Sequence, residues 1–449
     1  MQVDLRDLTR GPIKKQILLF SLPLILSNLL QVLFNMADVA VVGRFAGACA
    51  LGSVGSTSTL IVLFTGFLIG MGSGVNVIVA RYYGANDYHA LHRTIHTSAV
   101  LCAIVGVVIM GLALTFAEGI LNLLNTKPEL MDGAKLYLRI YCLGMPAVAV
   151  YNFGAAVFSA VGDTKKPLYY LMIAGVVNVV LNLFFVIVCH MSVAGVALAS
   201  IISHYISATL IVIALIRSSN TAFALVPKAL SIDGDKAKMI LSFGIIAGCQ
   251  NAIFAIANLF VQSGVNSFDA TMVAGNAAAS NADGMIFEIM AAFYTACASF
   301  IGQNYGAGNR ERVKQSFRIC LAYSALVGAG LGALAILFGE KFLMLFTTDP
   351  LVAKAGMYSL IVKGVAYWIS AFMDCSVAAS RALGKSVVPS VILIGGSCVF
   401  RIVWIYTVFA YFGTPASLYL LYCASWTISS IAEVWYFKHI FRKVMPKTA

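Results

Sequence analysis

The chain has 449 residues, of which 60% are hydrophobic and 11% are charged, and its formal net charge is +12. A water-soluble domain carries roughly a quarter charged residues, so this composition excludes an ordinary soluble protein and indicates a membrane protein. The positive charge alone would also suit nucleic-acid binding, which the positions of the basic residues argue against below.

Twelve apolar segments, six in each half, are long enough to cross a bilayer, which takes about 20 helical residues. They lie at 16–42, 53–80, 94–117, 135–160, 167–190, 193–216, 238–263, 273–301, 316–338, 355–381, 387–410 and 415–438. No signal-peptide pattern is present, so we expect the first segment to stay in the mature protein. We therefore predict an all-α integral membrane protein with 12 transmembrane helices.

The two halves of the sequence repeat one another. IVARYYGAND at 78–87 ends the second span and IGQNYGAGN at 301–309 ends the eighth, and their Tyr-Gly-Ala cores are 222 residues apart. The same offset pairs Gly162 with Gly384. A register kept through helices and loops indicates a duplication. We expect the repeated Tyr-Gly-Ala segment to be a structural turn without chemistry.

Residues 217–237 form the long polar loop between the halves. We predict a cytoplasmic linker here, between an N-terminal six-helix bundle at 1–216 and a C-terminal one at 238–449. Because six is even, both bundles enter the membrane in the same direction, as a parallel repeat.

The basic residues set the orientation. Most of the 30 Lys and Arg residues lie in the two tails and in the loops after even-numbered spans. The five in loops on the other side are Arg44, Lys127, Lys135, Lys341 and Lys354. The positive-inside rule then places both termini in the cytoplasm. This distribution also explains the charge of +12 without nucleic acid.

Several kinds of chemistry have no signature in the sequence. There is no G-x-x-x-x-G-K-[ST] nucleotide-binding loop, and the 10 cysteines include no C-x-x-C pair. His89, His92 and His96 share one helical face, which we expect to be solvated, because a metal site would add a carboxylate or thiolate. We therefore expect a transporter rather than an enzyme, with no cofactor, no ATPase subunit and no metal beyond Na⁺.

Asp38 is an acidic residue inside the first span. A carboxylate in hydrocarbon costs several kcal/mol, so it should face the protein interior or a water-filled cavity. Asn35 precedes it by one turn, Asn178 and Asn182 share a face of the fifth span, and Ser200 lies in the sixth. One acid with neutral oxygen donors suits a proton or a monovalent cation. The alternative is that the Asn and Ser side chains only hydrogen-bond neighbouring helices.

The second half does not repeat these polar residues. Its tenth span contains Asp374, whose repeat partner is Asn152, while Asp38 is matched by Phe260. Gln250 lies in the seventh span. The frame is therefore shared between the halves, but the polar sites are not.

Further polar residues of the second half are candidates for a cation or substrate cavity. Asp283 and Glu288 lie in the eighth span, and Arg401 in the eleventh is a candidate counter-ion for one of them. Tyr294 is a candidate cavity residue. Glu433 lies near the inner end of the last span, where its side chain can extend to water.

The sequence resembles the multidrug and toxic compound extrusion (MATE) family over essentially its whole length. The resemblance rests on SLPLILSNLLQVLFNMADVAVVGRFAG at 21–47, VARYYGAND with its repeat, AVGDTKKP at 160–167 and RALGKSVVP at 381–389. It implies a V-shaped pair of six-helix bundles that exports organic cations in exchange for Na⁺ or H⁺.

The resemblance also implies roles for individual residues. Asp38 matches the first-span acid of the family, and Asp374 matches the tenth-span acid. Asn178, Asn182 and Ser200 match the cation cluster of the amino-terminal lobe. The position of Asn182 is often Asp in the family, so the site here has less charge. Gln250 or Asn251 stands near the position of a seventh-span Glu that one branch of the family has, which puts a carboxy-terminal Na⁺ site in doubt unless Asp283 or Glu288 substitutes for it.

We therefore expect a cation-coupled antiporter of the cytoplasmic membrane that exports amphipathic, cationic small molecules by alternating access. Its partners would be these substrates and membrane lipid, without nucleic acid. The alternative is a flippase for lipid-linked oligosaccharides, whose anionic pyrophosphate would require more bases than acids in the spans. The spans contain five acids and three bases, which favours the exporter.

Overall fold

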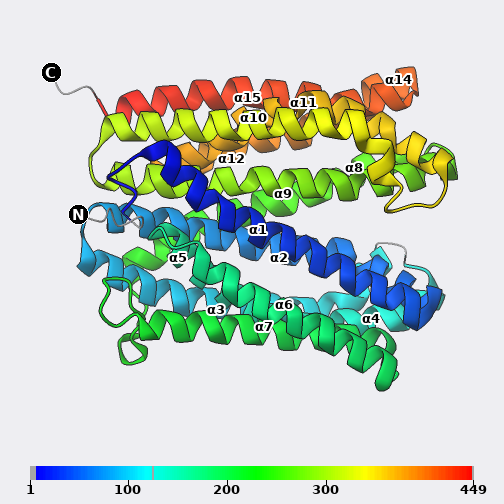
Figure 1. The fold of residues 1–449 in the computed structure, drawn as a ribbon, viewed down its shortest axis with the longest axis horizontal. Coiled ribbons are helices and arrows are strands. Elements are labelled where there is room, and N and C mark those ends of the chain that lie inside the picture. Colours follow the sequence, from blue (N-terminus) through cyan, green and yellow to red (C-terminus); the bar gives the residue numbers. More distant parts are fainter. Residues whose placement is uncertain (1–6, 124–125, 447–449) are drawn as a thin grey trace. The chain divides into compact units, whose positions relative to one another are not determined.

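A computed structural model describes residues 7–123 and 126–446, so residues 1–6 and 447–449 of the predicted cytoplasmic tails lie outside the described part. All regular secondary structure in the described residues is helical (Figure 1), which confirms the predicted fold class. The α-helices are α1 (Ile13–Val41), α2 (Gly47–Gly84), α3 (Tyr88–Leu123), α4 (Pro128–Cys142), α5 (Met145–Ala160), α6 (Lys165–Leu183), α7 (Ser192–Arg217), α8 (Gly234–Val265), α9 (Ala270–Gly306), α10 (Arg310–Leu343), α11 (Pro350–Ala382), α12 (Val387–Leu393), α13 (Phe400–Trp404), α14 (Ala410–Phe412) and α15 (Pro415–Val444). Short π-helical or 3₁₀ segments are η1 (Val42–Ala46), η2 (Phe184–Val188), η3 (Pro227–Ala229), η4 (Ile394–Val399) and η5 (Ile405–Phe409).

Each predicted span falls on helix in the structure. Nine helical runs in the described chain are long and apolar enough to cross a membrane, or ten if the bent pair α4–α5 counts as one span. One of the nine, residues 13–84, contains the first two predicted spans. The run of α15, rich in Ser and Thr, is not among the nine.

The fourth span differs from its prediction. The predicted segment at 135–160 consists of two helices, because α4 ends at Cys142, α5 begins at Met145, and the two helices meet at 44°. Pro146 lies in the first turn of α5, and proline cannot donate the backbone hydrogen bond that a continuous helix would need there. The predicted fourth span is therefore helical but bent before this proline.

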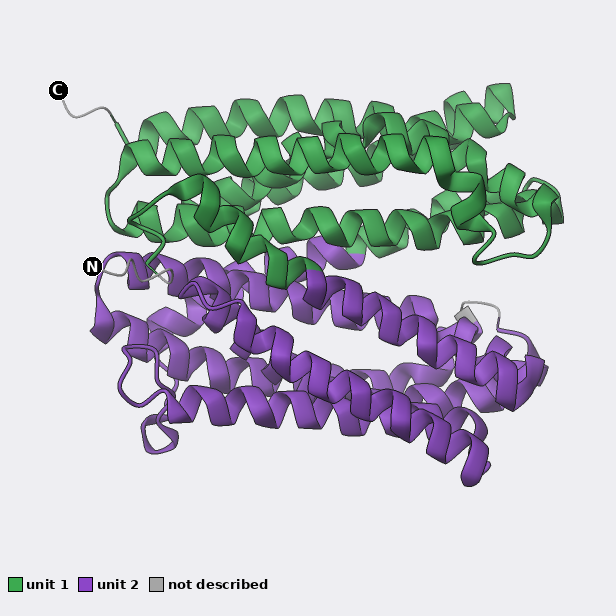
Figure 2. Ribbon diagram, in the orientation of Figure 1, with its two compact units in different colours: residues 1–25, 253–449 green, residues 26–252 purple. Residues whose placement is uncertain are grey.

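The described chain forms two compact units (Figure 2). Unit 1 contains residues 1–25 and 253–449, and unit 2 contains residues 26–252. The start of α1 thus packs with the second half of the chain, and the start of α8 packs with the first half. The predicted bundles at 1–216 and 238–449, with their linker, describe the sequence repeat and remain a prediction.

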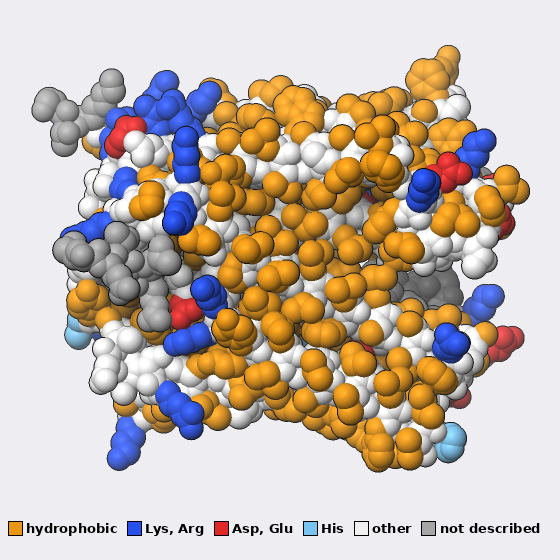
Figure 3. Space-filling model, in the orientation of Figure 1, with side chains coloured by type: hydrophobic (Ala, Val, Ile, Leu, Met, Phe, Trp, Pro, Cys, Tyr) orange, Lys and Arg blue, Asp and Glu red, His pale blue; other side chains and the backbone are white. Residues whose placement is uncertain are grey.

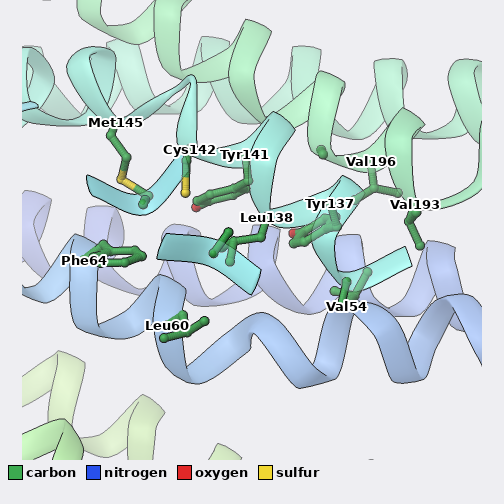
Figure 4. Close-up of a cluster of buried hydrophobic side chains, with 14 of the residues drawn as sticks. Val54, Leu60, Phe64, Tyr137, Leu138, Tyr141, Cys142, Met145, Val193 and Val196 are labelled. Carbon is green, nitrogen blue, oxygen red and sulfur yellow. The ribbon is translucent and has the colours of Figure 1, made fainter. Parts of the chain in front are cut away.

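The core of unit 2 joins α2, α4, α5 and α7. Figure 4 shows its side chains pointing toward one another from these four helices. They include Val54, Leu60, Phe64, Leu138, Met145, Val193 and Val196. Burial of such side chains is what fixes α4 beside α2 and α7, and α4 in turn positions two tyrosines discussed below.

A ridge of small residues lets α2 and α8 approach closely within unit 2. A Cβ atom added at Gly70 would lie 2.4 Å from the backbone nitrogen of Gly248, and one at Gly74 would lie 2.8 Å from that of Gly244. Helices in lipid associate through such close packing of small residues. The glycines at four-residue spacing on α2 therefore serve helix packing.

The duplicated Tyr-Gly-Ala turns have the same backbone conformation in both copies. Asn86 and Gly308, which occupy the same repeat position, have φ of 54° and 70°. Each donates its N–H to the carbonyl three residues earlier, at 3.2 and 3.1 Å. This is the left-handed ending of a helix, in which orphan carbonyls find donors. The two copies therefore form the same type of turn, and the absence of chemistry there remains a prediction.

The second pair of repeated glycines supports the same conclusion. Gly162 has φ of 91° and Gly384 has φ of 88°, a region that favours glycine. Both residues follow a helix that ends a predicted span. The match in backbone conformation at two separate turns confirms that the halves are duplicated in structure as well as in sequence.

The linker at 217–237 is held against α3. His96 is 1% exposed, and its Nε2 accepts a hydrogen bond of 2.9 Å from the backbone N–H of Val226. Thr97 accepts another from the N–H of Asp233 at 3.1 Å, and the Asp233 carboxylate pairs with Arg93. The prediction of a fully solvated histidine face was therefore wrong for His96, which anchors the linker.

We expect His96→Ala to loosen this linker. The substitution removes the acceptor of the Val226 N–H, a hydrogen bond worth about 1 kcal/mol, so limited proteolysis within 217–237 should become faster. His89→Ala is the matched control, because His89 is exposed on the same helix. Equal cleavage rates in the two variants would show that His96 does not hold the linker.

The surface of each unit agrees with a position in lipid. On the face seen in Figure 3, hydrophobic side chains cover the middle of the helices, whereas Lys, Arg, Asp and Glu lie toward the helix ends. Leu337 and Leu345 of unit 1 are 73% and 76% exposed. Such an extended apolar surface would be costly in water and is favourable in a bilayer.

Candidate functional site

Four of the residues predicted for the first half meet inside unit 2. Asp38 lies near the end of α1, Asn178 and Asn182 lie one turn apart on α6, and Ser200 lies on α7. Each is at most 9% exposed. The structure thus brings together side chains from three helices that the sequence separates by up to 162 residues.

These side chains form a closed ring of hydrogen bonds. The Asn182 amide donates to one oxygen of the Asp38 carboxyl, and the Ser200 hydroxyl donates to the other at 3.1 Å. Asn182 also donates to Oδ1 of Asn178 at 3.2 Å, and Asn178 donates to the Ser200 hydroxyl at 3.5 Å. We call these four residues the Asp38 cluster.

One acceptor of the Asp38 cluster is left without a donor. Oδ1 of Asn182 is buried and has no hydrogen-bond partner among the described residues. A buried acceptor of this kind costs about 1–3 kcal/mol unless something satisfies it. A monovalent cation would use such oxygens as ligands, and a proton on Asp38 would neutralise the buried carboxylate.

Two π-helical turns adjoin the Asp38 cluster. η1 begins four residues after Asp38 and η2 begins two residues after Asn182. Turns of this type widen a helix locally and are frequent at functional sites. They place irregular backbone beside the two helices that carry the acid and its amide donors.

Two tyrosines near the Asp38 cluster were missed in the sequence. Tyr137 and Tyr141 of α4 stack at 5.8 Å between ring centroids, and both interact electrostatically with Asp38. Figure 4 shows both rings in the buried core of unit 2. Their spacing of four residues on a helix was a usable signal, but it does not show which helices they face, which the core of unit 2 reveals.

The other predicted residues of unit 2 do not join the Asp38 cluster. Asn35 is exposed, and the Asn152 amide donates to Val148 of its own helix at 3.0 Å. Gln250 is 7% exposed on α8. Its neighbour Asn251 donates to the carbonyl of Gly66 at 2.8 Å, a contact that belongs to the packing of α8 on α2.

In unit 1, Asp283 forms an ion pair that the sequence analysis did not predict. Nζ of Lys363 lies 2.9 Å from Oδ2 of Asp283, and the Tyr367 hydroxyl donates to Oδ1 at 2.6 Å. Lys363 also lies over the ring of Tyr422, 4.4 Å from its centroid. Asp283 is therefore compensated by a lysine from α11.

The prediction of Arg401 as counter-ion to Asp283 or Glu288 was wrong. Arg401 makes no ion pair within the described chain, and it donates to Asn258 at 3.2 Å and to Ser425 at 3.4 Å. Its guanidinium group lies 4.5 Å from the centroid of Tyr422. Glu288, on α9, is half-buried. Helical periodicity gave no means of choosing between the three bases in the spans.

Asp374 lies on α11, the helix that packs against α9, α10 and α15. Oδ2 of its carboxyl is buried without a hydrogen-bond partner among the described residues. The hydroxyl of Tyr294 on α9 is also buried and interacts electrostatically with Asp374. The structure therefore brings together two predicted residues, Asp374 and Tyr294.

The expectation that Glu433 extends to water was wrong. Its side chain is 0% exposed on α15. The sequence places Glu433 near a helix end, but α15 continues for eleven residues beyond it to Val444. The helix therefore continues beyond the predicted apolar segment, which ends at 438.

Comparison with known proteins shows which family has this architecture. The model of the MatE family matches residues 23–184 and 247–407, one stretch in each half of the chain. The chain belongs to the MatE family. The paired match agrees with the repeated turns, and it confirms the family resemblance seen in the sequence.

Several relatives of this MatE protein carry names that describe transport. It is 30% identical over 346 residues to the probable multidrug resistance protein YpnP of Bacillus subtilis (strain 168). This alignment covers 77% of each chain. It is 24% identical over 380 residues to the multidrug export protein MepA of Staphylococcus haemolyticus, with 81% of each chain covered. The FAD transporter of Shewanella oneidensis is 23% identical over 370 residues, again with 81% of each chain covered.

Solved structures establish the fold. An outward-facing multidrug resistance MATE family transporter of the MOP superfamily aligns with a TM-score of 0.91 over 99% of both chains, at 20% identity. A MOP superfamily transporter from Pyrococcus furiosus, described as having a binding pocket of reverse polarity, aligns with a TM-score of 0.92 over 99% of both chains, at 20% identity. This MatE protein thus has the MATE transporter fold with twelve predicted membrane helices.

Proposed function

We propose that this MatE protein is an antiporter that exports amphipathic organic compounds and is driven by an inward gradient of H⁺ or Na⁺. The observation that carries the proposal is the Asp38 cluster. A carboxylate buried in unit 2 accepts hydrogen bonds from two other helices, and a nearby buried oxygen lacks a donor. Intramembrane acids of this kind mark ion pathways.

The exchange follows from the charge of Asp38. An ionised carboxylate in a low-dielectric interior favours any positive charge that reaches it. A cationic substrate and the driving cation therefore compete for the same negative charge. Binding of the driving cation neutralises Asp38 and weakens the retention of the substrate, which is then released. Alternating access between the two bundles would couple these events to transport.

The orientation follows from the basic residues. Lys and Arg gather in the tails and in the loops after even-numbered spans, which supports cytoplasmic termini and insertion in the cell membrane. With this orientation, the anchored linker at 217–237 lies on the cytoplasmic side.

The test is efflux of fluorescent dyes from vesicles that contain the purified chain. Gradients of H⁺ and Na⁺ are imposed separately, with a cationic dye such as ethidium. We expect one of the two gradients to accelerate efflux, and collapse of that gradient to abolish the acceleration. An efflux rate that neither gradient changes, across a panel of cationic dyes, would contradict the proposal.

A second candidate function is transport of an anionic compound, as in the lipid-linked oligosaccharide flippase alternative. The observation that favours it is the position of two cations beside the ring of Tyr422. Nζ of Lys363 lies 4.4 Å from the ring centroid, and the guanidinium carbon of Arg401 lies 4.5 Å from it. Arg401 has only neutral hydrogen-bond partners among the described residues. Two cations beside an aromatic ring suit an aromatic or phosphorylated anion. Transport of an anionic dye and of a lipid-linked sugar, measured in the same vesicles, tests this candidate.

A further inference from the structure

The end of α15 exposes a basic face for which the proposed exchange at Asp38 has no use. Trp435 is 68% exposed, and Lys438, His439, Arg442 and Lys443 follow it as exposed residues. They come three, four, seven and eight residues after the tryptophan, so all five share one side of the helix. Their side chains line an open hollow of about 510 Å³. We call these five residues the α15 basic face.

The opposite side of this helix end is packed inside unit 1. The ring of Phe437 lies 4.1 Å from that of Phe317 on α10, measured between centroids. Nε of Arg310 donates to the carbonyl of Met445 at 2.6 Å, and its guanidinium carbon lies 5.0 Å from the ring centroid of Phe441. These contacts fix the rotation of α15 about its axis. The α15 basic face is therefore turned away from the rest of unit 1.

The protein does not compensate the positive charges of this face. No hydrogen bond or ion pair joins Lys438, Arg442 or Lys443 to another residue of the described chain. The neighbouring helix end carries one acid, Glu311, to which Gln315 of the same helix donates at 3.4 Å. Figure 3 shows Lys and Arg side chains gathered near the C-terminal end of the described chain. The face therefore has an excess of positive charge that is free to meet an anion.

Toward the middle of α15, the same side of the helix becomes apolar. Ile428 and Ile431 precede Trp435 by seven and four residues, and both are exposed, Ile431 at 68%. A helix rises about 1.5 Å per residue, so Lys438 and Arg442 lie about 4–10 Å beyond the tryptophan along the axis. Tryptophan prefers the boundary between hydrocarbon and headgroups. The bases therefore lie at the depth of the lipid headgroups.

We propose that the α15 basic face binds the headgroup of an anionic phospholipid. The acyl chains lie along Ile428 and Ile431, and the phosphate lies beside Lys438, Arg442 and Lys443, whose long side chains reach it from the helix. An acidic soluble protein or a nucleic acid would match the charge, but not the apolar strip that continues from it. With the orientation proposed above, this lipid belongs to the cytoplasmic leaflet, whose surface is negative.

The test is native mass spectrometry of the purified full-length chain in detergent, titrated with phosphatidylglycerol or with phosphatidylcholine. Both lipids have a phosphate, but only phosphatidylglycerol has a net negative charge, so we expect it to bind more tightly. Each basic residue near an anionic surface contributes about fivefold in affinity. Lys438→Gln/Arg442→Gln/Lys443→Gln should therefore bind phosphatidylglycerol about a hundredfold more weakly, with little change for phosphatidylcholine.

The matched control is Lys127→Gln/Lys341→Gln/Lys354→Gln, which removes the same charge from three exposed lysines in separate parts of the chain. It should bind phosphatidylglycerol like the wild type. Equal affinity of the two triple variants for this lipid would overturn the proposal, and so would displacement of the bound lipid by an equal concentration of inorganic phosphate. If the first triple variant fails to fold, Arg442→Gln alone should still lose about fivefold. The readout needs no transport, so it is independent of whether gradient-driven efflux occurs.

Discussion

Gly70→Leu is expected to prevent stable folding of unit 2. Even a Cβ atom at this position would lie 2.4 Å from the backbone of Gly248 and 2.6 Å from that of Ala247. Backbone cannot rotate away as a side chain can, so α8 would have to separate from α2. Overpacking costs typically 1–3 kcal/mol and more when backbone must move. We expect a loss above about 3 kcal/mol, a large part of the usual total stability.

The measurement is thermal unfolding of the purified protein in detergent, together with its recovery as a monodisperse species. Gly55→Leu is the matched control on the same helix, because Gly55 is exposed and a Cβ there meets nothing within 4 Å. It should unfold like the wild type. Equal stability of Gly70→Leu and Gly55→Leu would show that α2 and α8 do not pack as described.

Asp38→Asn is expected to abolish cation-driven efflux while the protein stays folded. The substitution keeps the shape of the side chain but removes the negative charge that binds the driving cation. It also removes the buried charge from the Asp38 cluster, so the folded state should not suffer. Efflux in vesicles with an imposed gradient should fall to the rate seen without a gradient. Asp132→Asn, at an exposed position on α4, is the control.

Ser200→Ala should identify the driving cation. The Ser200 hydroxyl donates to the Asp38 carboxylate at 3.1 Å, and hydrogen bonds to charged groups are worth about 1.5–3 kcal/mol. Without it, the carboxylate is less stable, so a proton should bind at roughly tenfold lower concentration. Na⁺ would instead lose an oxygen ligand and need a roughly tenfold higher concentration. An unchanged concentration dependence for both cations would show that Ser200 has no part in the site.

Much of the fold could be predicted from the sequence, because hydropathy and the repeat are local signals. The twelve spans and the duplicated turns at Asn86 and Gly308 follow from apolar runs and from glycine spacing. The break at Pro146 could have been predicted, since proline removes a backbone donor. The sequence could not predict that the first part of α1 belongs to unit 1, because this depends on contacts between distant segments.

The contacts in the candidate sites could likewise be predicted from the sequence only in part. The Asp38 cluster was predicted because a lone intramembrane acid is costly and a spacing of four residues fixes Asn178 and Asn182 on one face. Lys363 as the partner of Asp283 was not predicted, since periodicity shows which residues share a face but not which neighbouring helix that face meets. For Glu433, hydropathy placed the helix end too early, and burial on α15 replaced the expected contact with water.

The coupling itself is tested most directly by driving it backwards. Vesicles containing the purified chain are loaded with the transported dye, no cation gradient is imposed, and internal H⁺ and Na⁺ are followed as the dye leaves. We expect one cation to enter as the dye leaves in the wild type, and not in Asp38→Asn. Dye export at the wild-type rate without movement of either cation would contradict the account, because the substrate would then cross without exchange.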